Sequence, residues 1–156
     1  MRFFETSKYH SLKKSTYINL RWIGIIGQLI SVNIVYFYFN FKFEFYFSVL
    51  IISFGILSNL YLIWIYKKTQ LSDRSALLFL LIDLFQLASL IYLTGGIVNP
   101  FIIFLIIPNV FASSNLSLRT NLFLVITTTI IIIFLTFFSL DLPEPLNDHF
   151  HVDNYY

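Results

Sequence analysis

The chain contains no cysteine, so its 156 residues cannot form a disulfide, a cysteine-ligated zinc site or a thiol redox centre. Charge is scarce as well, since 12% of the residues are charged while 58% are hydrophobic. A soluble domain of this size needs far more surface charge, so lipid must be the solvent for most of the chain. The sequence also lacks a Walker loop, a phosphate-cradling glycine loop and a nucleophile elbow. We therefore assign no catalytic residue and expect no nucleic-acid partner.

Long apolar runs recur along the whole chain. Most are about 20 residues long, the length that a helix needs to cross roughly 30 Å of hydrocarbon. The fourth run is shorter, and about 13 helical residues span only about 20 Å, so a full crossing and a re-entrant hairpin both remain open there. We predict an all-α fold, a polytopic membrane helical bundle with five transmembrane helices. The runs cover residues 18–39, 45–66, 76–93, 100–112 and 122–140.

The charged residues predict how the bundle is oriented. The loop at 67–74 is basic, and Arg119 follows the fourth run, whereas the alternate loops carry one lysine, no charge, or mostly acid. Because Lys and Arg in short loops mark the cytoplasmic side, we expect a cytoplasmic N-terminal segment at 1–17. The transmembrane bundle then occupies 18–140, and an acidic periplasmic tail occupies 141–156.

Three histidines are present, but they do not suggest a metal site. His10 lies in the basic N-terminal segment, while His149 and His151 lie two residues apart in the acidic tail. Histidines in polar tails are usually solvated side chains, so we expect no metal ion.

The turn T-G-G-I-V-N-P-F at 94–101 lies between the third and fourth runs. Gly95 and Gly96 suit the end of a helix, where positive φ is needed. Asn99 suits an N-cap and Pro100 the first helical position. The same residues allow a binding site, because the start of a helix offers free backbone N–H groups and Phe101 offers a flat ring. Such a setting suits a quinone, although the turn is fully explained by its structural role.

Asp83 lies near the centre of the third run, where a bare carboxylate is costly. We expect it to be protonated, paired or directed into the bundle. Gln86 follows three residues later on the same helix face, and with Ser89 it predicts a polar strip that leads towards Thr94. Interhelical hydrogen bonding and a proton or ligand role both fit this strip. Further polar residues in the first two runs predict interhelical hydrogen bonds: Gln28, Asn33 and Asn59.

Three blocks of the sequence, in this order, resemble the redox-responsive sensor histidine kinases of the RegB/PrrB type. The stretch at 20–28 is similar to that family's R-W-x-A-I-x-G-Q motif, with Gly24 in place of the usual alanine. The stretch at 83–96 resembles its D-x-x-Q-L…L-T-G-G approach, and 95–101 matches its G-G-x-x-N-P-F heptapeptide.

The resemblance implies a six-helix sensor in a bacterial inner membrane that feeds a cytoplasmic histidine kinase. In that family the heptapeptide is tied to ubiquinone binding, which damps autophosphorylation. It also implies a homodimer, a cognate response regulator reached through the kinase core, and ATP bound only by that core. Carried over residue by residue, the quinone-binding positions are Gly95, Gly96, Asn99, Pro100 and Phe101.

The chain also departs from the family. It has no dimerisation helix with a phosphoacceptor histidine, no ATP-binding domain, no redox-active cysteine and no sixth helix. We therefore expect the sensory fragment of a longer kinase, without catalysis of its own. Two alternatives stay open: a small transporter or channel subunit with Asp83 and Gln86 lining a path, and a membrane scaffold without a ligand.

Overall fold

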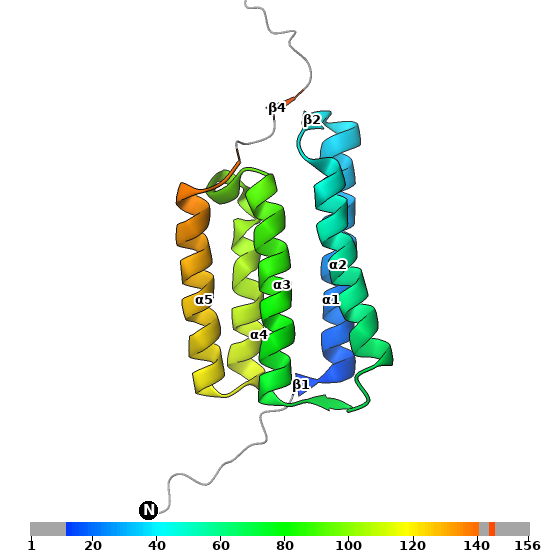
Figure 1. Ribbon diagram of the computed structural model, residues 1–156, viewed down its shortest axis with the longest axis vertical. Helices are drawn as coiled ribbons and strands as arrows, with labels where there is room; N and C mark the ends of the chain where they lie inside the picture. The colour runs from blue at the N-terminus through cyan, green and yellow to red at the C-terminus, as the bar shows by residue number, and fades with distance from the viewer. Residues whose placement is uncertain (1–11, 141–143, 146–156) are drawn as a thin grey trace, which may run out of the picture.

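The computed structural model describes residues 12–140 and 144–145 (Figure 1). The three histidines, most of the N-terminal segment and most of the acidic tail lie outside these described residues. The main helices are α1 (Lys14–Asn33), α2 (Phe45–Trp64), α3 (Asp73–Leu93), α4 (Ile107–Asn115) and α5 (Leu118–Phe137). A π-helical turn, η1 (Ile34–Tyr38), extends α1, and two 3-10 segments, η2 (Gly96–Val98) and η3 (Pro100–Ile106), precede α4.

The helices form one bundle with two groups, α1 with α2 and α3 with α4 and α5 (Figure 1). α1 packs on α2 as an antiparallel hairpin, and α2 packs on α3. α3 in turn packs against η3, α4 and α5. Among the described residues, four helices are long and apolar enough to cross a membrane: α1 with η1, α2, α3 and α5. The predicted all-α, polytopic membrane bundle is confirmed.

The fourth segment runs the whole length of the bundle. It begins with seven residues of 3-10 helix and continues with nine of α-helix. At about 2.0 Å per 3-10 residue and 1.5 Å per α residue, it spans about 27 Å. The backbone N–H of Ser117, just beyond α4, donates to Asp73 Oδ1 at the start of α3 over 2.9 Å, so α4 ends opposite the Gly95–Asn99 turn. The estimate of about 20 Å was wrong because it assumed α-helical rise and ended the segment at residue 112.

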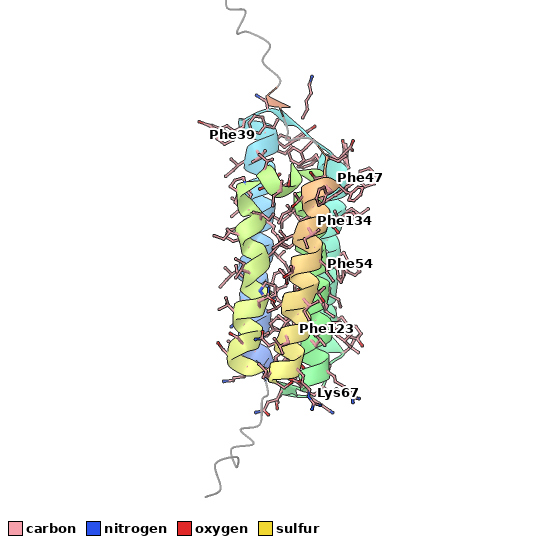
Figure 2. The ribbon with its side chains drawn as sticks, turned by 90° about the vertical axis from the view of Figure 1, so that its left-hand side faces the viewer. Phe39, Phe47, Phe54, Lys67, Phe123 and Phe134 are labelled. Atoms are coloured by element: carbon pink, nitrogen blue, oxygen red, sulfur yellow. The ribbon has the colours of Figure 1, made fainter. Side chains whose placement is uncertain are left out.

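Short strand pairs close the two ends of the bundle. β1 (Leu12–Lys13) pairs with β3 (Gln70–Leu71) at the end where the basic loops lie. β2 (Phe41–Lys42) pairs with β4 (Glu144–Pro145) at the other end. Figure 2 shows Lys67 at the first end, with Phe39 and Phe47 towards the second. The structure thus places most of the loop cations at one end and Lys42 at the other, as the orientation prediction requires, without fixing which side of a membrane the first end faces.

Large apolar side chains cover the outside of the bundle. Phe54, Phe123 and Phe134 point outward in Figure 2, and each is at least half exposed. The interior holds fully buried leucines from different helices, such as Leu62 on α2, Leu84 on α3 and Leu124 on α5. An apolar surface around an apolar core is the arrangement expected where lipid is the solvent.

Candidate functional site

A cavity of about 600 Å³ separates α1 from α3, η3 and α4. Its wall is largely apolar, and its rim carries exposed side chains from both sides, such as Ile23 on α1 and Ile107 on α4. Volumes of this size are typical of sites for small organic molecules. The cavity thus lies between α1 of one group and α3, η3 and α4 of the other, while α2 packs on α3.

An ion pair crosses this cavity. Arg21 Nη2 lies 2.7 Å from Asp83 Oδ1, and the Tyr17 hydroxyl donates to Asp83 Oδ2 over 2.5 Å. Arg21 Nη2 also donates to Ser58 Oγ on α2 over 3.0 Å. Asp83 is therefore paired, one of the three states expected for an intramembrane carboxylate. Because Tyr17 and Arg21 are one helical turn apart, a single face of α1 supplies both partners.

A second polar bond links α1 to α3 further along the cavity. Gln86 Nε2 donates to Gln28 Oε1 over 2.9 Å. Gly55 on α2 leaves room for the Gln86 side chain, since a Cβ at Gly55 would lie 2.6 Å from Gln86 Nε2. The interhelical role predicted for Gln28 is confirmed.

Two other predicted polar contacts are wrong. Ser89 is exposed and donates to Phe85 O of its own helix over 2.8 Å, because it lies on the far side of α3 from Asp83. The polar strip therefore passes from Gln86 to Thr94 without it. Asn33 likewise bonds its own helix, at Leu29 O. Asn59 does reach across from α2, to Ile18 O at 3.5 Å.

The Gly95–Asn99 turn is built as its residues predict. Gly95 and Gly96 have φ of 108° and 55°, values that side-chain-bearing residues rarely adopt. Asn99 caps η3, since its Oδ1 accepts from the Phe101 N–H over 2.9 Å, and Pro100 takes the first position. The helix-stop and helix-start interpretation is confirmed.

The expectation of free donors at this turn is wrong. Asn99 Nδ2 donates to Thr94 O over 3.0 Å and to Thr94 Oγ1 over 2.6 Å. The backbone N–H of Phe101 is taken by Asn99 Oδ1, and that of Ile102 donates to Asn99 O over 3.0 Å. Cap and 3-10 hydrogen bonds thus use the donors that were expected to face a ligand.

The cavity brings the turn and the intramembrane polar residues to one place. Asn99, Phe101, Asp83 and Gln86 all line it, whereas Gly95, Gly96 and Pro100 do not. Sequence reasoning missed Tyr17 and Arg21 as partners of Asp83.

A comparison of residue depths along the two helices could have identified these partners of Asp83. α1 and α3 run in the same direction, and Arg21 and Asp83 lie about 10 Å and about 15 Å from the basic ends of their helices. A long arginine side chain covers that difference, and pairing with a cation is one way to hold an ionised carboxylate at this depth.

Most of the chain is similar to known membrane sensor domains. Residues 15–156 match the PilS-like transmembrane domain, a six-helix membrane family. Over 128 residues the chain is 28% identical to the sensor histidine kinase RegB of Cereibacter sphaeroides, covering 81% of this chain and 28% of that relative. No solved structure matches. The resemblance to the RegB type is confirmed, and the chain spans less than a third of its relative's length. The chain is a multi-pass membrane protein that belongs to the PilS-like transmembrane domain family.

Proposed function

We propose that the chain is the quinone-sensing input domain of a two-component sensor histidine kinase of a bacterial inner membrane. The cavity carries this proposal, because it joins the heptapeptide residues Asn99 and Phe101 to the ion pair of Arg21 and Asp83. The relative named as a sensor histidine kinase is more than three times longer than the aligned segment. The kinase core is therefore proposed to belong to a longer protein of which this chain is the membrane part.

The cavity suits ubiquinone or a related quinone in size and chemistry. Apolar walls and the rings of Phe101 and Phe104, whose centroids lie 5.7 Å apart, can flank a flat ring. The exposed rim between α1 and α4 would let an isoprenoid tail leave towards lipid. Polar side chains inside the cavity can meet the ring oxygens, which a wholly apolar pocket could not do.

The position of the cavity also suits signalling. Three side-chain contacts connect α1 to α3 across it, from Tyr17 and Arg21 to Asp83 and from Gln86 to Gln28. A ligand in the cavity would bias how these helices sit, and autophosphorylation of the attached kinase core is the proposed output. The core alone would bind ATP and contact the response regulator, in a homodimer with cytoplasmic N-termini.

A transport path lined by Asp83 and Gln86 is less well supported. Both oxygens of Asp83 are bonded, one to Arg21 and the other to Tyr17. A path residue would need a carboxylate that exchanges partners freely.

The test is binding of ubiquinone-1 to the purified membrane domain in detergent micelles. Phe101→Leu keeps apolar volume but removes the ring, and we expect affinity to fall about 3- to 10-fold, as the loss of an aromatic contact implies. Phe123→Leu is the matched control, since Phe123 is an exposed phenylalanine of α5 that does not line the cavity. Equal affinity for the parent and Phe101→Leu, or no binding to the parent, would contradict the proposal.

A further inference from the structure

We propose that Arg21 donates the hydrogen bond that recognises the cavity's ligand, and that its acceptor is a neutral ring carbonyl oxygen. This inference deepens the proposed quinone site and rests on it. The ligand's oxygen is then recognised at the ion pair between α1 and α3 and not at the Asn99 turn.

The guanidinium of Arg21 has donors to spare. Its side chain is only 3% exposed, and Nη2 makes its bonds to Asp83 and Ser58. Nε and Nη1 are buried and have no hydrogen-bond partner among the described residues. Arginine carries five N–H donors, and leaving buried donors unpaired is costly, so such atoms call for a partner. Arg21 lines the cavity, but Nε and Nη1 are themselves covered, so the partner's oxygen reaches them when the side chains that cover them move aside.

The partner's charge follows from Asp83. The carboxylate of Asp83 already balances the Arg21 cation at 2.7 Å. An anionic ligand would add a second negative charge beside Asp83 inside a low-dielectric interior, which is strongly unfavourable. A neutral oxygen that only accepts hydrogen bonds meets the spare N–H groups without that cost. A ring carbonyl has this chemistry.

Two aromatic rings lie against the guanidinium of Arg21. The guanidinium carbon lies 5.5 Å from the centroid of the Tyr17 ring and 5.8 Å from that of Phe79. These rings hold the guanidinium in place, so its orientation is largely set before a ligand arrives. A donor fixed in this way loses little entropy when it binds.

The turn cannot supply this bond as it stands. The Asn99 amide is committed to Thr94, and the N–H groups of Phe101 and Ile102 are committed to Asn99. The heptapeptide therefore shapes the cavity and provides the Phe101 ring. Two parts of the chain thus contact the ligand. The turn provides an aromatic ring, and α1 provides the hydrogen-bond donor for the ligand's oxygen.

The first arm of the test compares Arg21→Lys with Ser58→Ala. Lysine keeps the positive charge for Asp83 but loses the planar fork with its spare donors. Ser58→Ala removes the other Nη2 bond and does not touch the cavity lining, so it is the matched control. The probes are ubiquinone-1 and a tetramethylbenzene with the same prenyl tail and no ring oxygen.

We expect Arg21→Lys to weaken ubiquinone-1 binding about tenfold or more, as the loss of a charged donor implies. Ser58→Ala should stay within about twofold of the parent. The oxygen-free probe should bind the parent and Arg21→Lys alike.

A second arm uses only the parent, in case Arg21→Lys does not fold. The chain has four arginines, so nitrogen-15 labelling of arginine gives few Nε–H signals: Arg2, Arg21, Arg74 and Arg119. The Arg21 signal, assigned by replacing the other three, should shift with ubiquinone-1 and stay unchanged with the oxygen-free probe. An Arg21 signal that stays unchanged while ubiquinone-1 binds overturns this inference and leaves the proposed function standing. A parent that binds no ubiquinone-1 overturns both.

Discussion

Replacing Asp83 with leucine tests whether the ion pair holds the two groups of helices together. The change removes the carboxylate that lies 2.7 Å from Arg21 Nη2 and accepts from the Tyr17 hydroxyl. Arg21 would remain as a buried cation with Ser58 as its bonded partner. Breaking a buried pair by removing one member typically costs about 3–5 kcal/mol. We expect Asp83→Leu to lose about that much free energy of unfolding.

The double variant Arg21→Met/Asp83→Leu separates the pair's own contribution from the cost of a stranded charge. With both charges gone, apolar side chains fill the same space, and such replacements are often close to neutral. We therefore expect the double variant to be more stable than Asp83→Leu by about 2 kcal/mol or more. Arg21→Met alone should resemble Asp83→Leu, since it strands the carboxylate instead.

The measurement is unfolding of the purified domain by SDS in mixed micelles, followed by helical circular dichroism. Helical content before SDS is added shows whether each variant is folded. The reasoning is refuted if Asp83→Leu unfolds within about 1 kcal/mol of the parent, because an arginine that reaches interfacial water by itself does not need Asp83. It is also refuted if the double variant is the least stable of the set.

Two further predictions concern the turn and the orientation. Gly96→Ala should lose at least about 1–2 kcal/mol in the same unfolding assay, because φ is 55° and the new Cβ would lie 2.9 Å from Leu135 O. Gly24→Ala is its control, with nothing within 4 Å of the new Cβ and a helical backbone, so it should be neutral or slightly stabilising; equal losses at both sites would contradict this. Single cysteines at Thr69 and Val98, both exposed, should label from opposite membrane faces, the first from the cytoplasm. Labelling of both from one face would overturn the orientation.

The helices could be predicted from the sequence, while several of their ends could not. Apolar runs mark the part of each helix that lies in lipid. They miss a polar first turn, which stays helical because a capping side chain accepts from its backbone N–H groups. α3 begins at Asp73 rather than Ala76, because Ser72 Oγ accepts from the Ser75 N–H. α5 begins at Leu118 rather than residue 122 for the same reason, since Ser117 caps it. A serine before a polar turn is a local signal that hydropathy overlooks.

The turn could be predicted in detail because its causes are local. Positive φ at two glycines and a cap by Asn99 depend on residues within one turn of each other. The same locality explains the error about free donors. A cap satisfies the N–H groups that a ligand would need, so a capped helix N-terminus leaves few N–H donors for a ligand.

The cavity could not be predicted, because it depends on the absence of close packing between α1 and its neighbours. Gly24 and Gly27 of α1 both line it, and nothing lies within 4 Å of a Cβ built at either one. In the sequence, two glycines in a helix suggest close packing against a neighbour or a weakened helix. Here they leave open space instead, and the ion pair of Arg21 and Asp83 spans the gap. Missing side chains on α1 therefore create the volume, and long polar side chains on the same face give that volume its chemistry.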